Sequence, residues 1–175
     1  MEKLTKQPCP FCSKKTLALV EDQKDIPYFG KVYLFSMNCS SCKYNKADVE
    51  SAEQKPAAKY TMDIESAKDM GVRIVKSSTA TVKMPQLRLS VTPGPASIGY
   101  ISNIEGVITR FEDVIKQEKE DSEDLEAKKK CKNLLKKLWK IKLGDVKTKI
   151  VIEDPYGNSA IVSNKAKVEK LQVKK

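Results

Sequence analysis

Four cysteines arranged as two closely spaced pairs constrain the fold of this chain more than any other feature. Cys9 and Cys12 form the first pair and Cys39 and Cys42 the second, with two residues between the members of each. A Cys-x-x-Cys turn directs two thiolates toward one point, and two such turns complete the tetrahedral shell of four sulfurs that suits Zn(II). Because thiolates fill all four positions, the sequence predicts one structural zinc ion, with no open position for water or substrate.

Disulfides, a redox Cys-x-x-Cys motif and buried apolar cysteines are the alternative explanations of the same residues. The segment Met1–Lys6 leads into the first pair without an apolar core, so no secretory signal is expected, and a reducing compartment disfavours disulfides. A redox motif explains one pair but not two. The sequence contains no histidine, which excludes a mixed Cys/His shell. Zinc is therefore the favoured interpretation.

The segment between the two cysteine pairs is predicted to form a long hairpin. It holds 26 residues, more than the roughly 15–20 usual for this motif. Residues 16–20 and 31–35 are rich in apolar and β-branched side chains, as in strands. Such a hairpin brings both pairs to one end, which is a zinc ribbon. We expect this ribbon to occupy residues 1–52 and a β domain to follow over residues 53–175.

The centre of the hairpin carries two adjacent aromatic residues. In the run Ile26, Pro27, Tyr28, Phe29, the proline interrupts strand pairing, and Gly30 permits a turn. One interpretation is that the aromatic rings pack over the hairpin or against the next domain. The other is an exposed apolar patch that binds a partner, since aromatic residues concentrate at interface hot spots. We predict that residues 26–29 form part of a partner surface.

From residue 60 the pattern becomes that of a β domain. Tyr60, Met62 and Ile64 alternate with polar residues, as expected of a half-buried strand. Further short strands are expected near residues 72–75, 79–82, 87–91, 146–153 and 159–163, the last two joined by a hairpin turn over 154–158. The evenly spaced short strands predict a mainly β fold, a sandwich or β-helical barrel. The last dozen residues are expected to fray or extend.

Two amphipathic helices interrupt the β pattern at about residues 103–143. Ser102 and Glu105 have the spacing of a capping box, Asp121 or Ser122 is a candidate cap for the second helix, and Gly144 is a candidate C-cap. Because β sequence brackets the helices, they are expected to form a helical hairpin inserted in one β domain. Cys131 lies on the apolar face of the second helix, so we expect a core residue rather than a metal ligand.

Charge is unevenly distributed along this helical hairpin. Residues 112–126 hold eight acids and two lysines, whereas residues 128–142 hold eight lysines and no acid. Attraction between the two helices is the favoured explanation. The alternative is a basic surface, with Trp139 nearby, that meets an acidic partner or a phosphate backbone.

Composition limits the function classes that remain. The chain has 175 residues and a formal charge of +10, which suits nucleic acid, an acidic protein surface or solubility alone. No stretch approaches the ~20 apolar residues of a membrane span, so a cytoplasmic protein without membrane contact is expected. Ser-His-Asp and Cys-His catalysis need a histidine, and no Walker loop is present. We therefore expect a protein that is not an enzyme.

Several motifs resemble the ZPR-one zinc-finger family, in its single-module archaeal form. The residues that carry the resemblance are the two cysteine pairs with Pro10, the run 26–30, the run 72–80 (Val-Arg-Ile-Val-Lys-Ser-Ser-Thr-Ala), the run 84–87 (Met-Pro-Gln-Leu) and the run 104–107 (Ile-Glu-Gly-Val). They span nearly the whole chain in the family order. The resemblance implies a zinc ribbon followed by a domain like a double-stranded β-helix with an inserted helical hairpin.

The resemblance also implies a function. Eukaryotic members carry two such modules in tandem, bind translation elongation factor one-alpha and act as a chaperone for its folding; binding to receptor tyrosine kinase tails is also described for the family. By resemblance, this single module would bind the archaeal counterpart of that factor. A nucleic-acid-binding zinc ribbon of the transcription or translation machinery is the alternative function.

Three positions depart from the family pattern. Glycine usually follows each cysteine pair and suits a positive φ, whereas Ser13 and Lys43 stand there in this chain. Gln86 replaces the acid that the family prefers after proline, so no charge contact is carried over to it. A client contact that needs two modules cannot be carried over either.

Overall fold

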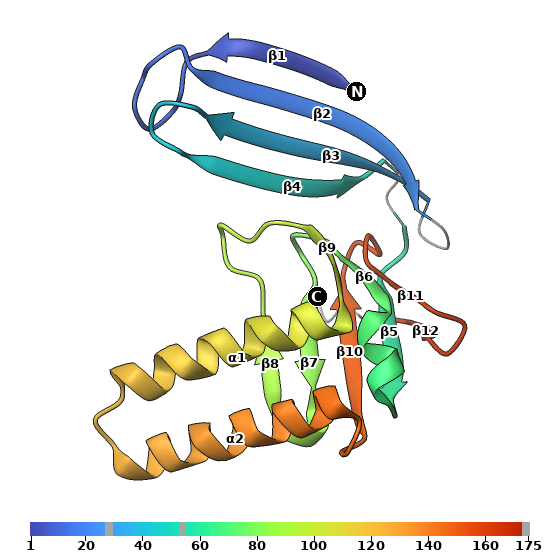
Figure 1. The fold of residues 1–175 in the computed structure, drawn as a ribbon. Helices are drawn as coiled ribbons and strands as arrows, with labels where there is room; N and C mark the ends of the chain where they lie inside the picture. The colour runs from blue at the N-terminus through green and yellow to red at the C-terminus, as the bar shows by residue number, and fades with distance from the viewer. Residues whose placement is uncertain (27–29, 53–54, 173–175) are drawn as a thin grey trace.

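A computed structural model describes residues 1–26, 30–52 and 55–172 of the chain. Figure 1 shows a four-stranded sheet lying above a second group of strands, from which two long helices extend to one side. The upper sheet comprises β1 (Glu2–Gln7), β2 (Leu17–Ile26), β3 (Gly30–Cys39) and β4 (Asn45–Ser51), in that order across the sheet. We call this sheet and its turns the ribbon, and residues 58–172 the β domain.

The long hairpin of the ribbon is formed by β2 and β3. These strands pair without a break from Leu17 opposite Cys39 to Ile26 opposite Gly30. The regular register over their full length places both cysteine pairs at the same end, as the sequence predicted. The outer strands β1 and β4 were not predicted, because their side chains are mostly polar and show little of the alternation that identifies a strand.

The β domain contains two antiparallel sheets. The larger has the strand order β12-β5-β10-β7-β8, and the smaller has the order β11-β6-β9. Their bounds are β5 (Ala58–Ile64), β6 (Arg73–Lys76), β7 (Thr81–Met84), β8 (Leu89–Val91), β9 (Tyr100–Asn103), β10 (Thr148–Asp154), β11 (Ala160–Val162) and β12 (Lys167–Lys170). Two short 3₁₀ helices, η1 (Ala67–Gly71) and η2 (Pro85–Leu87), connect strands. The mainly β class with a helical insertion is confirmed.

One turn predicted as a hairpin instead joins the two sheets. Residues 154–158 reverse the chain between β10 and β11, but β10 pairs with β5 and β7, whereas β11 pairs with β6. The buried carboxylate of Asp154 holds this corner by accepting hydrogen bonds from the hydroxyls of Ser77, Thr79 and Ser159. Turn composition predicts a change of direction but does not choose the partner strand.

The C-terminal segment is more ordered than expected. Instead of fraying, residues 167–170 form β12 and pair with β5 along the edge of the larger sheet. All four side chains of β12 are exposed, so backbone hydrogen bonds rather than burial define this strand. The lysine-rich segment has no apolar alternation by which this strand could be identified from the sequence.

A single apolar core fills the β domain. Tyr60, Met62 and Ile64 of β5 point into it, as their alternation predicted. Its other buried members come from both sheets and both helices: Ala58, Met70, Ile74, Ala80, Val82, Met84, Ile104, Val107, Ile108, Phe111, Ile115, Cys131, Leu138, Ile141, Ile150, Ile152 and Ile161. Cys131 is thus a core residue, as expected.

The helices α1 (Ile104–Asp121) and α2 (Leu125–Leu143) begin later than the predicted caps. Asn103 caps α1 by accepting a hydrogen bond from the Gly106 amide at 2.8 Å, and Asp124 caps α2 through the Glu126 amide. The capping box proposed for Ser102 is wrong, because β9 continues to Asn103 in its pairing with β6. Gly144 ends α2 with φ +85°, as predicted.

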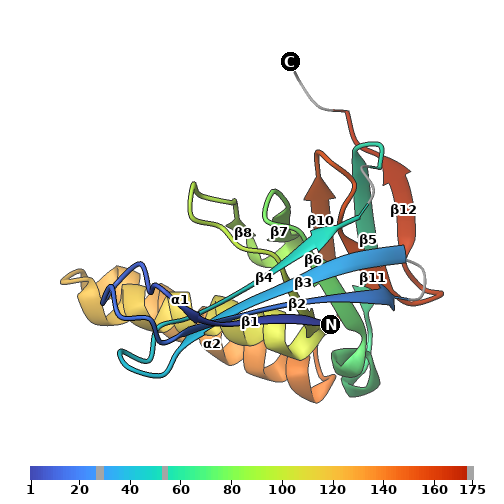
Figure 2. The same cartoon turned by 90° about the horizontal axis from the view of Figure 1, so that it is seen from above.

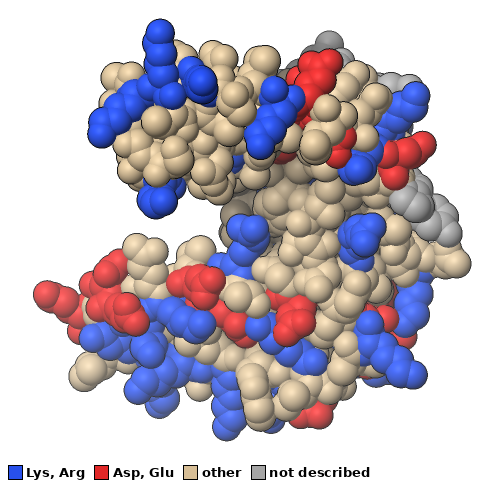
Figure 3. All heavy atoms as spheres, turned by 45° about the horizontal axis from the view of Figure 1, so that its top comes forward, with Lys and Arg blue, Asp and Glu red and all other residues tan. Residues whose placement is uncertain are grey.

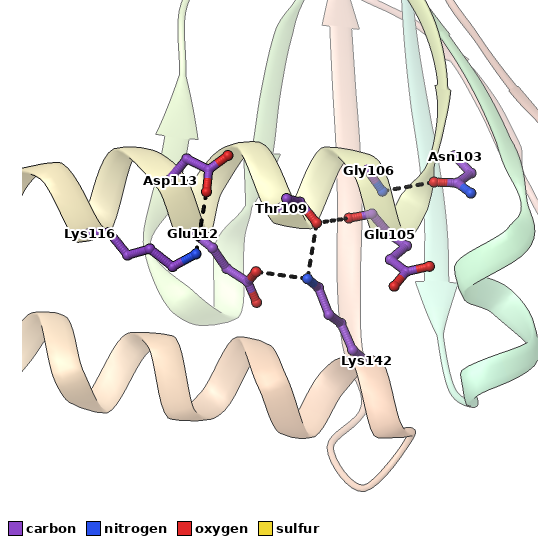
Figure 4. A network of polar contacts seen from close by, with 8 residues as sticks. All are labelled: Asn103, Glu105, Gly106, Thr109, Glu112, Asp113, Lys116 and Lys142. Carbon is purple, nitrogen blue, oxygen red and sulfur yellow. Dashed lines mark hydrogen bonds and ion pairs between the residues drawn. The ribbon is translucent and has the colours of Figure 1, made fainter.

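Opposite charges join the two helices near their inner ends. Lys142 donates to Glu112 at 2.7 Å and to the Thr109 hydroxyl at 3.0 Å (Figure 4). Within the described ranges this is the one ion pair found between α1 and α2. Attraction between the helices therefore accounts for only part of the charge pattern, and most lysines of α2 lie toward solvent.

The ribbon packs on the β domain through one end. Ile26 and Val32 of the ribbon form a buried cluster with Val75 and Ala160. Nearby, the Gly99 amide donates to Asp48 of β4 at 2.7 Å, and a side chain at this glycine would collide with the backbone of β4. The other end of the ribbon, which carries the cysteines, extends in the same direction as the helices in both ribbon views (Figures 1 and 2).

Candidate metal centre

The two cysteine turns have the same backbone structure. In the first, the Ser13 amide donates to the Cys9 carbonyl at 2.9 Å; in the second, the Lys43 amide donates to the Cys39 carbonyl at 3.0 Å. The amide of the first cysteine of each pair donates in turn to the residue five positions later. These repeated bonds fold each pair around its own sulfurs, so each turn is built to hold a metal ion.

Both turns require a left-handed residue directly after the second cysteine. Ser13 has φ 57° and Lys43 has φ 62°. Glycine adopts this conformation readily, whereas an L side chain there costs about 1 kcal/mol. The absence of glycine therefore strains the turns without changing their shape.

The four sulfurs lie close enough together to share one ion. The Sγ atoms of Cys9, Cys12, Cys39 and Cys42 all lie within 4.8 Å of one another. Cys9 and Cys42 are 3.6 Å apart, and Cys12 and Cys39 are 3.7 Å apart. A tetrahedral site with Zn–S bonds of about 2.3 Å places its sulfurs about 3.8 Å apart. These separations far exceed a disulfide bond of about 2.0 Å, and all four cysteines are free thiols.

The surroundings of the sulfurs favour the thiolate form of Cys39 but oppose a second negative charge on Cys42. The backbone amide of Cys42 and the hydroxyl of Thr16 lower the pKa of Cys39 to about 6. At Cys42 the Tyr44 amide lowers the pKa, but burial and the neighbouring thiols outweigh it and raise the pKa to about 12. A divalent cation removes this opposition, so the donor set fits Zn(II), which the four cysteines would hold as a closed tetrathiolate.

Apolar side chains cover one side of the sulfur cluster. Cys9 and Cys39 are buried with Leu17, whereas Cys42 is exposed. The ring of Phe11 lies 4.5 Å from that of Tyr44 across the two turns. Thr16 and Tyr44 were not identified from the sequence, because a hydroxyl and an amide that support a ligand follow no fixed spacing.

The predicted partner surface is only partly placed. Ile26 is buried, with 6% of its surface exposed, and contributes to the cluster that joins the ribbon to the β domain. Pro27, Tyr28 and Phe29 lie outside the described residues. Ile26 thus belongs to the buried junction between the ribbon and the β domain.

Two further features bear on function. Gln86, which stands where an acid was expected, accepts hydrogen bonds from the Thr148 hydroxyl and the Lys149 amide with Oε1. A neutral amide therefore supplies an acceptor at this position.

Neither helix within the described part of the chain has an apolar stretch long enough to cross a membrane.

Both parts of the chain match models of protein-family domains. Residues 2–57 match the model described as the ZPR1 zinc-finger domain, and residues 68–175 match the ZPR1 jelly-roll domain. The second description agrees with the two-sheet architecture seen here, since a double-stranded β-helix is a form of jelly roll. The first covers the four sulfurs.

Individual relatives cover most of the chain. An uncharacterized ZPR1-like protein of Methanocaldococcus jannaschii is 36% identical over 163 residues, which is 93% of this chain and 82% of the relative. A similar protein of Pyrococcus horikoshii is 36% identical over 167 residues, 93% of this chain and 75% of the relative. The protein named zinc finger chaperone zpr1 in Schizosaccharomyces pombe is 30% identical over 140 residues, 78% of this chain but only 30% of that longer protein.

Proposed function

Because this chain belongs to the ZPR1 family, we propose that it is a zinc-stabilised module that binds translation elongation factor one-alpha, in its archaeal form, and assists the folding of that factor. The observation that carries the proposal is a closed four-thiolate site on a ribbon joined to a jelly-roll domain, in a chain similar to a protein named as a chaperone. The archaeal form is chosen because two archaeal ZPR1-like proteins each match 93% of this chain.

The proposed role is binding rather than catalysis. In a tetrathiolate site the metal has no position for a substrate, so its contribution is to hold the ribbon in shape. The proposal assigns no catalytic residue and places the protein in the cytoplasm, where its client is made.

The run 26–29 is our proposed part of the contact surface. Tyr28 and Phe29 supply two adjacent aromatic side chains, and aromatic residues dominate the affinity of many protein interfaces. Ile26 holds the base of this run in the cluster shared with the β domain. A partner bound here would therefore contact both the ribbon and its junction.

A pull-down from native cytosol tests the proposal. Zinc-loaded protein is used at moderate salt with nuclease added, and captured proteins are identified by mass spectrometry. We expect the elongation factor as the main partner and its loss on Phe29→Ala. Trp139→Ala is the matched control, because Trp139 is a 59% exposed aromatic on α2, outside the ribbon. Failure to recover the factor with the unmodified protein contradicts the proposal.

Nucleic-acid binding is a second candidate, which the outer surface of α2 favours. Lys129, Lys132, Lys136 and Lys140 are all exposed and follow helical spacing, with Trp139 beside them. Affinity for unrelated RNA or DNA that falls steeply with salt, and weakens in the Lys132→Glu/Lys136→Glu variant, supports this role. Recovery of a protein partner that nuclease and salt do not affect counts against it.

A further inference from the structure

A cavity of about 300 Å³ lies between the β8–β9 loop and the first half of α1. Its volume is at the lower end for ligand sites, enough for one or two side chains rather than a large cofactor. The walls are mostly apolar and come from both sheets, the loop and the helix: Val82, Val91, Ile98, Val107, Phe111 and Val114.

Two cations lie against one aromatic ring in this cavity. Arg110 lies over the ring of Tyr100, with its Cζ 4.2 Å from the centroid, and the Lys76 amine lies 5.6 Å from the same centroid. Lys76 is only 4% exposed, and its amine donates to the Ser77 carbonyl at 2.9 Å and to the Ser97 hydroxyl at 3.5 Å. The Tyr100 ring and both cations belong to the cavity lining.

The positive charge at this cavity lacks a carboxylate partner. None of the lining residues is acidic, and neither Lys76 nor Arg110 takes part in an ion pair among residues 1–26, 30–52 and 55–172. Burial lowers the pKa of the Lys76 amine and the charge of Arg110 lowers it further, and the carboxylates of Asp154 and Asp48 only partly offset this. A buried cation of this kind is stabilised by an anion that enters with a ligand.

The cavity is placed where a chain segment of another protein has access. The β8–β9 loop and α1 both face the overhanging ribbon in Figure 1, and the space-filling view shows the molecule hollowed between the two parts (Figure 3). The loop is held in position by the bond between Gly99 and Asp48 of β4. A segment that passes between the ribbon and α1 would therefore lie beside the β8–β9 loop, which lines the cavity.

We propose that this cavity binds an apolar segment of the protein partner that carries an acidic side chain, with the apolar group between α1 and the loop and the carboxylate between Lys76 and Arg110. A guanidinium such as that of Arg110 can donate two parallel hydrogen bonds to a carboxylate, and Ser97 adds a neutral hydroxyl to the cavity lining. This inference rests on the proposed function, because the occupant is a segment of the partner.

Blocked peptides test the pairing directly. The probes are acetyl-Phe-Glu-Leu-amide and acetyl-Phe-Gln-Leu-amide, which differ in charge but hardly in shape. Binding to the zinc-loaded protein is followed by amide chemical shifts, including those of Gly99 and Tyr100. We expect the glutamate peptide to bind about tenfold more tightly than the glutamine peptide, and this preference to disappear in Arg110→Gln.

Arg73→Gln is the matched control, because Arg73 is an exposed arginine that does not line the cavity. Lys76→Met keeps the aliphatic stem of the lysine and gives an independent test at the buried position. Equal affinity for the two peptides, no binding at millimolar concentration, or an unchanged preference in Arg110→Gln overturns the proposal. Tighter binding of free 4-phenylbutyrate than of the glutamate peptide also overturns it, in favour of a small acid.

The same variants separate this inference from the proposed function. If the elongation factor is captured equally by the unmodified protein and by Arg110→Gln, the function stands and the cavity assignment is wrong. If the peptides bind as expected but the factor is not captured, the cavity assignment stands and the partner is a different acidic protein.

Discussion

The ribbon and the β domain are both built mainly from antiparallel strands, but they are stabilised in different ways. Twenty buried side chains form the core of the β domain, with contributions from both sheets and both helices. At the metal end of the ribbon the buried cluster has three members, Cys9, Leu17 and Cys39, and two of these are candidate ligands. A single sheet with one covered face cannot bury enough apolar surface at this end to hold its own shape.

This difference in buried apolar residues predicts that a metal ion stabilises the ribbon and not the β domain. The β domain loses apolar contacts when it unfolds, whereas the cysteine turns lose the coordination that holds four thiolates together. Zinc binding contributes directly to folding free energy where no preformed site exists without it. We therefore expect the two regions to respond separately to loss of a thiolate and to loss of a core side chain.

Loss of a ligand should have the largest effect. We expect Cys39→Ala to abolish stoichiometric zinc binding and to unfold the metal end of the ribbon, because Cys39 is fully buried and supplies one of four sulfurs. Cys131→Ala is the control: it removes a buried cysteine from the β domain and should keep one zinc ion per chain. Metal analysis and amide spectra distinguish the two variants, and equal zinc contents would contradict the assignment.

Loss of a core side chain should act on the other region. Ile152 is fully buried in β10, at the centre of the larger sheet, so Ile152→Ala should lower the free energy of unfolding of the β domain by about 2–5 kcal/mol. Denaturant titration measures this, and the zinc content should not change. Val168→Ala, on the edge strand β12 with 64% of its surface exposed, should cost less than about 0.5 kcal/mol.

An ion pair of the β domain should give a smaller, pH-dependent effect. Lys165, bonded at 2.8 Å, and the amides of Glu65 and Ser66 lower the pKa of Asp69 from 3.8 to about 2. A lowered folded-state pKa stabilises the protein above the unfolded value, and this stability is lost as pH falls from about 4 toward 2. We expect a loss of about 1–2 kcal/mol, allowing for the exposed lysine.

The variant Asp69→Asn isolates this contribution. It should unfold more easily at pH 7 but lose less stability than the unmodified protein between pH 5 and 2, as measured by denaturant titration across that range. Asp63→Asn is the control, since Asp63 forms an exposed pair with Lys149 and should leave the pH profile nearly unchanged. Identical profiles for the unmodified protein and Asp69→Asn would show that this carboxylate does not contribute.

Relief of backbone strain should have the smallest effect. Ser13→Gly and Lys43→Gly place glycine at positions with positive φ, so each should stabilise the zinc-loaded ribbon by up to about 1 kcal/mol. Competition with a chelator measures the gain as tighter zinc retention. Arg88→Gly relieves a similar φ of 55° in the β domain and should leave zinc retention unchanged.

The metal centre was predictable because its signal is local. The Cys-x-x-Cys spacing identified Cys9, Cys12, Cys39 and Cys42, and the strand-like residues 16–20 and 31–35 identified the hairpin between the two pairs. The apolar alternation of β5 was equally informative, because the side chains on one face of that strand are buried in the core. Local patterns of this kind need no knowledge of the rest of the fold.

Features that depend on distant partners were not predictable. The turn at 154–158 changes sheets because Asp154 bonds hydroxyls that lie about 75 residues earlier in the sequence. Likewise, Asn103 rather than Ser102 caps α1, because pairing with β6 extends β9 by one residue. Strands β1, β4 and β12 are polar edge or near-edge strands whose pairing is decided by their neighbours. The cavity beside α1 unites four separate segments for the same reason.

Region-resolved hydrogen exchange, before and after zinc is removed with a chelator, tests the central claim most directly. We expect amides of β2 and β3 near Leu17 and Cys39 to lose most of their protection when the metal is removed, while those of β10 in the β domain keep theirs. Return of one zinc ion per chain should restore the ribbon. Protection that persists in the ribbon without metal, or that disappears equally in both regions, would contradict the account.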